Sequence, residues 1–149
     1  MTLNAAHLIW VWSSTLAAVA CILAGLIRGG APERWGAVIL FLTWFSVPLI
    51  DNHRGFRPGI FTVDVLTLIA YGVLSAWSRK PWTFFATVFQ LATVATHVAT
   101  LLDWTSNFTY MTVSQIFGAW GLVIATAWGV LTARKPPRPA AAEPDAANG

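Results

Sequence analysis

Two ionisable side chains, Asp64 and His97, lie inside long apolar runs of the sequence. Asp, Glu and His form the proton relays of membrane pumps, and imidazole titrates near neutral pH. At a helical rise of roughly 1.5 Å per residue, Asp64 would lie about 6 Å inside one end of its run, and His97 about 7.5 Å inside the same end of the next. Gln115 enters a later run at a similar level. The sequence therefore predicts an intramembrane polar layer, with Tyr71 and Gln90 deeper on the same helix faces.

Both ionisable groups also have a structural interpretation. Asp64 lies in the first turn of its run, where the helix dipole favours a carboxylate, and Arg57 could reach it as a partner. His97 could make an interior hydrogen bond. A charge at the centre of a span costs on the order of 2.5–3.5 kcal/mol by insertion scales, so such groups usually face the bundle interior and mark functional sites. Both interpretations remain open on the sequence alone.

The elements that must position these groups are membrane helices. Of the 149 residues, 56% are hydrophobic and 10% are charged, with a mean hydropathy of +0.63. Globular domains carry about 25% charged residues, so this chain requires a bilayer as its solvent. The net charge of +3 does not indicate nucleic acid, because the basic residues are distributed among the loops of a membrane protein. The single Cys21 excludes an intramolecular disulfide and a cysteine-based zinc site.

The apolar runs predict an all-α fold, a polytopic bundle of five transmembrane helices within residues 1–132. The runs cover residues 6–27, 35–50, 60–77, 82–102 and 110–132. The second run is short and contains Pro48, so its crossing is the least secure. Residues 133–149 are basic and then rich in Ala and Pro, which predicts a disordered tail.

The distribution of positive charge predicts the orientation. Seven of the 9 Lys and Arg residues fall on one side of a five-span chain, and Arg54 and Arg57 fall on the other. The seven are Arg28, Arg34, Arg79, Lys80, Arg134, Lys135 and Arg138. The positive-inside rule makes the first side cytoplasmic, with the N-terminus outside, and we expect a bacterial inner-membrane protein. Arg134, Lys135 and Arg138 should touch anionic lipid headgroups.

A second polar group is predicted in the outer loops. It comprises Asp51, His53, Arg54, Arg57 and Asp103. The two arginines stand on the side that positive charge normally avoids. They could be neutralised by the nearby carboxylates as a clamp between helices, or form an anion site, since guanidinium forks suit carboxylate or phosphate.

Small residues form a stripe along the fifth run. At steps of three and four, one face carries Ser114, Gly118, Gly121, Ala125 and Gly129. Small faces let membrane helices approach each other closely, so this stripe predicts helix packing.

Three functions are compatible with these features, and the sequence favours the first of them. The first is a non-enzymatic accessory, assembly or interaction subunit of a larger membrane complex, with a membrane-protein partner or a second copy, because the sequence has no nucleophile constellation or phosphate-binding loop. The second is a proton or small-solute pathway through Asp64 and His97. The third is a haem b protein with His7 and His97 as ligands, since both histidines fall near the same side. No other metal or cofactor is predicted.

Overall fold

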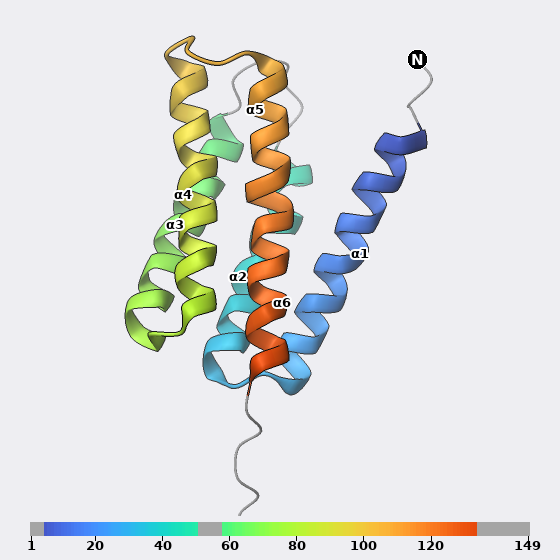
Figure 1. Cartoon of the computed structure of the whole chain (residues 1–149), viewed down its shortest axis with the longest axis vertical. Helices are drawn as coiled ribbons and strands as arrows, with labels where there is room; N and C mark the ends of the chain where they lie inside the picture. Colours follow the sequence, from blue (N-terminus) through green and yellow to red (C-terminus); the bar gives the residue numbers. More distant parts are fainter. Residues whose placement is uncertain (1–4, 51–57, 134–149) are drawn as a thin grey trace, which may run out of the picture.

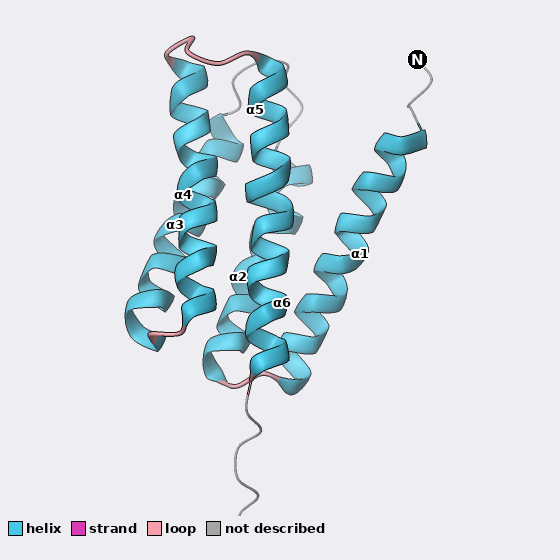
Figure 2. Ribbon diagram, in the orientation of Figure 1, coloured by secondary structure: helices cyan, strands magenta, loops and turns pink. Residues whose placement is uncertain are grey.

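The computed structural model describes residues 5–50 and 58–133, without the side chains of 5–8, 48, 107, 108 and 111. The described part is entirely helical, which confirms the predicted all-α fold. Its elements are α1 (Ala5–Arg28), α2 (Ala31–Ile50), α3 (Pro58–Ser78), α4 (Pro81–Leu101), α5 (Asn107–Val113), η1 (Ser114–Gly121) and α6 (Leu122–Thr132). The last three follow one another without a break and form one long rod (Figures 1 and 2).

Four stretches of helix are long and apolar enough to cross a membrane. They are Ile9–Arg28, Pro58–Ser78, Pro81–Leu101 and Ser114–Thr132. The 20-residue helix α2 is not among these four. The fold is therefore that of a membrane helix bundle, with at least these four helices of spanning length among the described residues.

Helix α2 begins at Ala31, ahead of the apolar run that starts at Trp35. Pro32 suits a first turn because the helix needs no N–H there, and Glu33 is favoured by the positive end of the helix dipole. The Arg34 amide already bonds the Gly30 carbonyl at 3.0 Å. Glu33 and Arg34, which the sequence pattern places in a loop, therefore belong to the first turn of α2.

The bundle is held together around Trp82 at the start of α4. Its side chain is 2% exposed. A Cβ placed on Gly36 of α2 would lie 2.5 Å from the Trp82 ring, and one on Gly129 of α6 would lie 2.6 Å from it. Because neither glycine has a Cβ, α2 and α6 can both pack directly against the Trp82 ring of α4.

The small stripe of the last rod faces α4. A Cβ on Gly118 would meet Thr93 at 3.1 Å, and one on Gly121 would meet Phe89 at 2.9 Å. Ala125 is 2% exposed. The stripe packs against α4 inside the bundle, so it does not form a free surface for another protein.

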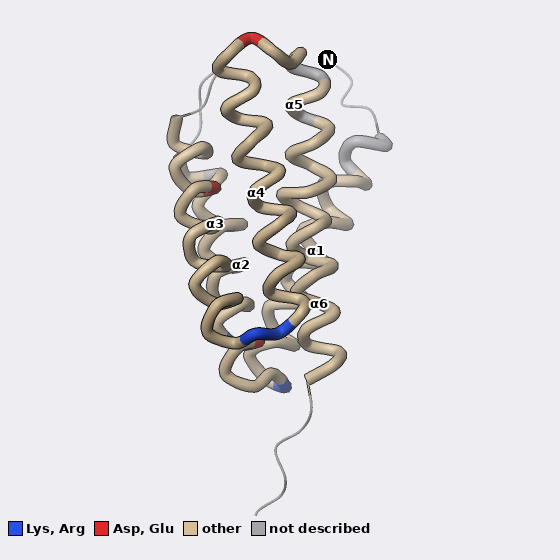
Figure 3. The backbone as a smooth tube through the Cα atoms, turned by 60° about the vertical axis from the view of Figure 1, so that its left-hand side comes forward, with Lys and Arg blue, Asp and Glu red and all other residues tan. Residues whose placement is uncertain are grey.

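Charge divides the molecule into two ends. The described Lys and Arg residues are Arg28, Arg34, Arg79 and Lys80, and all lie at one end, here called the basic end (Figure 3). Asp103 lies at the opposite end, in the turn after α4. The interior between them contains few charges, among which Asp64 is buried.

Candidate functional site

The polar centre of the bundle is a contact between α3 and α4. His97 Nε2 lies 2.8 Å from Asp64 Oδ2. Gln90 Nε2 donates to Asp64 Oδ1 at 2.8 Å and to the Asp64 carbonyl at 3.1 Å. Both carboxylate oxygens therefore have a partner, and all three side chains are buried. These three residues are called the Asp64 triad below.

Helical spacing explains why α4 delivers two of the partners. Gln90 and His97 are seven residues apart, or about two turns, so they lie on the same face. Thr93 lies between them on that face. The short link between α3 and α4 makes these helices antiparallel neighbours, which brings Asp64, in the second turn of α3, opposite the last turns of α4.

The His97 ring is buried, and one of its two nitrogens has no hydrogen bond among the described residues. It is 1% exposed, and the rings of Phe61 and Tyr110 lie 5.6 and 5.0 Å from its own, centroid to centroid. Its Nδ1 has no hydrogen-bond partner among the described residues. A carboxylate that accepts from Nε2–H fixes the neutral ring with Nδ1 as an acceptor. Nδ1 is thus an acceptor that no described residue uses.

A cavity of about 330 Å³ adjoins the triad, and its wall carries both polar and apolar side chains. Helices α1, α2, α3 and α4 and the α5–η1 segment all contribute to its wall. Its polar lining residues are Ser14, Thr15, Thr43, Asp64, Thr93, His97, Tyr110, Ser114 and Gln115. A water in the liquid takes up about 30 Å³, so the space suits on the order of ten waters or a small polar solute.

The π-helical turns of η1 form one wall of this cavity. Ser114, Gln115 and Gly118 of η1 all line it. The Ser114 hydroxyl is buried and has no partner among the described residues. Wide π-helical turns occur often at functional sites, because they break the regular i→i+4 pattern and re-aim side chains. The sequence carried no signal for this feature.

The predicted polar layer is only partly one site. Gln115 lines the cavity and accepts a hydrogen bond from Trp10 Nε1 at 3.3 Å. Gln90, expected deeper, bonds Asp64 directly. Tyr71 lies apart: it is fully buried, and its hydroxyl is 3.2 Å from the Gly36 carbonyl and 3.3 Å from the Thr126 hydroxyl.

The predicted outer-loop cluster falls largely outside the described residues. This holds for Asp51, His53, Arg54 and Arg57. Asp103 is described: it is exposed, has a φ of 54°, and lies outside the cavity.

Other predicted residues also lie outside the described part. The tail residues Arg134, Lys135 and Arg138 do, and so does the side chain of His7, the second ligand of the haem hypothesis. Among the described residues, no group of three or more His, Cys, Asp and Glu side chains could hold a metal ion.

Sequence reasoning missed a second buried carboxylate, at the basic end. Glu33 is 1% exposed. Its Oε1 lies 2.6 Å from Lys80 Nζ and accepts from Trp82 Nε1 at 3.3 Å. Its Oε2 has no partner among the described residues. The available signal was a lone glutamate and a lysine in two loops on the same predicted side, but the sequence does not show that those loops meet.

This pair gives a first testable expectation. Replacing Lys80 by Met leaves the Glu33 carboxylate buried without its cation, which should lower the free energy of unfolding by about 1–3 kcal/mol. Breaking a fully buried pair costs more, but the Lys80 side chain is 40% exposed. Glu33→Gln removes the charge while its amide oxygen still accepts from Trp82, so it should cost less. Thermal unfolding in detergent would rank the stabilities of the two variants. An unfolding temperature of Lys80→Met equal to that of the wild type would contradict the prediction.

The fold and site together define a helical membrane bundle with a buried acid–imidazole centre beside a cavity of mixed polar and apolar lining. Comparison of the chain with protein-family models, with curated proteins and with solved structures finds no significant match in any of the three. Function must therefore be argued from the site itself.

Proposed function

We propose that this protein is a proton pathway of a bacterial inner membrane, with the Asp64 triad as its protonatable site. The basic end is then cytoplasmic, α2 is the fifth crossing helix, and the cavity opens toward the outer half of the bilayer. The observation that carries the proposal is the buried Asp64–His97 contact of 2.8 Å in the wall of a cavity of about 330 Å³.

The chemistry of the pair suits reversible proton binding. With one proton on Nε2, the neutral imidazole leaves a net charge of −1 on Asp64, which Gln90 stabilises. A second proton on Nδ1 gives an imidazolium beside a carboxylate, which is net neutral. The hydrogen bonds of Gln90 hold the carboxylate in place in both states. The site can therefore exchange one proton without rearranging its partners.

The cavity supplies the approach to this site. Water within it could reach His97, whereas the faces of the bundle that meet lipid are apolar. Deeper polar contacts continue on α3 toward the basic end, where the Thr43 and Thr67 hydroxyls lie 2.7 Å apart and Tyr71 contacts Thr126. A proton path through the bundle would follow this face of α3.

Filling the cavity tests the proposal while leaving the triad intact. Ser114→Leu places an isobutyl group in the cavity wall and sacrifices no hydrogen bond of the Ser114 side chain among the described residues. We expect it to lower proton flux into liposomes, read with a trapped pH-sensitive dye, by at least about tenfold. Ser13→Leu is the matched control, because Ser13 is exposed and lies outside the cavity. Flux that is equal in both variants, or absent from the wild type, would remove the proposal.

The accessory-subunit hypothesis, which the sequence favoured, is the second candidate, with one observation in its favour. The outer half of α1 departs from the other helices (Figure 1), and Trp12 and Leu16 on it are 63% and 67% exposed. A partner helix could cover this face. Purification in mild detergent through a C-terminal tag would recover that partner in stoichiometric amount, whereas a solitary protein would exclude this candidate.

A further inference from the structure

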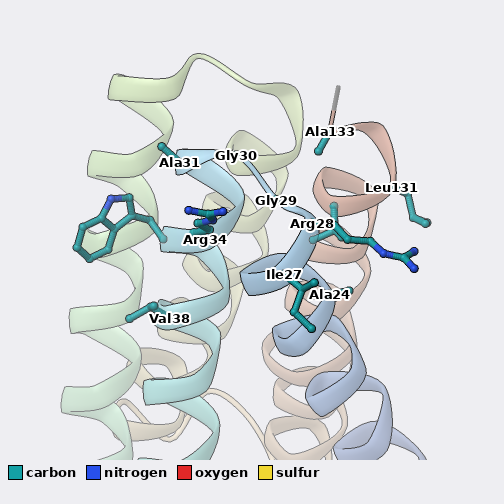
Figure 4. A pocket seen from close by; sticks show the side chains of 12 residues that line it. Ala24, Ile27, Arg28, Gly29, Gly30, Ala31, Arg34, Val38, Leu131 and Ala133 are labelled. Atoms are coloured by element: carbon teal, nitrogen blue, oxygen red, sulfur yellow. The ribbon is translucent and has the colours of Figure 1, made fainter. Parts of the chain in front are cut away.

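A second and larger hollow lies at the basic end, far along the bundle from the Asp64 triad. Its volume is about 980 Å³, and it is formed where α1 ends, α2 begins and α6 ends (Figure 4). Gly29 and Gly30, which link α1 to α2, lie in its floor and contribute no side chains. The hollow is thus built by the tight connection of two helices.

The lining combines cationic and apolar groups. Arg28 and Arg34 are both exposed and both line the hollow. The remaining side chains that form its wall are apolar: Ala24, Ile27, Ala31, Trp35, Val38, Val130, Leu131 and Ala133. Neither arginine has an ion pair among the described residues. The carboxylate nearest to Arg34 in sequence is that of Glu33, which is buried and forms an ion pair with Lys80.

The position of the hollow identifies the kind of ligand. Arg28 is the last residue of α1, where its membrane-length stretch ends, and Trp35, in the second turn of α2, is 57% exposed. Trp and Arg at the end of a span lie at headgroup level. The apolar wall continues from there into the span, so a ligand that fills the hollow must carry an anion at one end and a hydrocarbon chain at the other.

We propose that this hollow binds an anionic phospholipid. Arg28 and Arg34, which extend toward opposite sides in Figure 4, each offer a guanidinium fork to the phosphate-bearing headgroup, since such forks match phosphate oxygens. An acyl chain lies against the wall formed by Ile27, Val38 and Val130. The inference is independent of the proton-pathway proposal.

The test is native mass spectrometry of the full-length protein. The protein is mixed in detergent with phosphatidylglycerol or phosphatidylcholine, and the lipid that stays bound after the detergent is removed is measured. We expect selective retention of phosphatidylglycerol. Arg28→Gln/Arg34→Gln should weaken it roughly 20-fold, at about a fivefold loss for each cation near the headgroups. Arg34→Gln alone should weaken retention about fivefold. Arg79→Gln is its matched control, because it removes one exposed charge from the same end, outside the hollow, and should retain the lipid.

A third variant separates a lipid from a soluble anion. Ala24→Trp fills the apolar wall and leaves both arginines in place. It should reduce phosphatidylglycerol binding, and millimolar glycerol 3-phosphate should not displace the lipid from the wild type. Equal retention of the two lipids, equal losses in Arg34→Gln and Arg79→Gln, or displacement by glycerol 3-phosphate would each overturn the proposal.

Discussion

Replacing Asp64 by Asn should reduce proton flux through reconstituted protein by about 100-fold. The exchange keeps the size and shape of the side chain, and its amide oxygen can still accept from Gln90, now bonded at 2.8 Å. The exchange removes the negative charge that would pair with an imidazolium at His97. Positioned proton-transfer groups typically contribute on the order of 10²–10⁴-fold, and the lower limit is used here. The measurement is dye-reported flux in liposomes under an imposed pH gradient.

The control for this variant is Asp103→Asn. It makes the same chemical change in an exposed turn outside the cavity, at a φ of 54° that Asn tolerates well. Flux should stay at the wild-type level. A folded Asp64→Asn protein with unchanged flux would remove the triad from the pathway. The lipid-retention measurement on the same sample would show whether the basic end is still folded.

Replacing Trp82 by Ala should produce the largest loss of stability. The side chain is 2% exposed, fits between two helices that each present a glycine, and donates to Glu33. Deleting a buried indole costs about 3–5 kcal/mol, because the lost contacts are only partly recovered by collapse of the cavity. Denaturation in mixed micelles, followed by circular dichroism, would measure the change in the free energy of unfolding.

Two glycine replacements show whether the cost arises from this contact. Gly129→Ala places a methyl group 2.6 Å from the Trp82 ring and should destabilise by about 1–3 kcal/mol. Gly72→Ala meets nothing within 4 Å and should be neutral or stabilising, since alanine favours helix. In the Trp82→Ala background the penalty of Gly129→Ala should vanish. Additive losses in that double variant would show that the ring and the glycine do not act through each other.

Hydrophobic composition determined the class of this protein because local properties are sufficient for it. A run of about 20 apolar residues becomes a helix wherever lipid denies water to the backbone. The sequence therefore predicted helices of membrane length, and the structure has four such stretches among the described residues. Helix ends were less well determined, because Glu33 and Arg34 are compatible with a loop and with a first turn alike.

Helical periodicity also placed candidate groups on common faces. Gln90 and His97 share one side of α4 because seven residues are nearly two turns, and this holds in any fold. The level of Asp64 could be estimated from the rise per residue. These arguments give position along and around one helix, and they do not say which helix lies opposite.

Only the tertiary structure decided which polar groups meet. It brought Gln90 to Asp64, separated Tyr71 from both, and joined Glu33 to Lys80 across 47 positions of sequence. It also decided the π-helical turns of η1 and the cavity beside them. The physical reason is that such contacts depend on how several helices are rotated and packed against one another. Rotation is selected by steric fits such as Trp82 between Gly36 and Gly129, which exist only when three helices are present together.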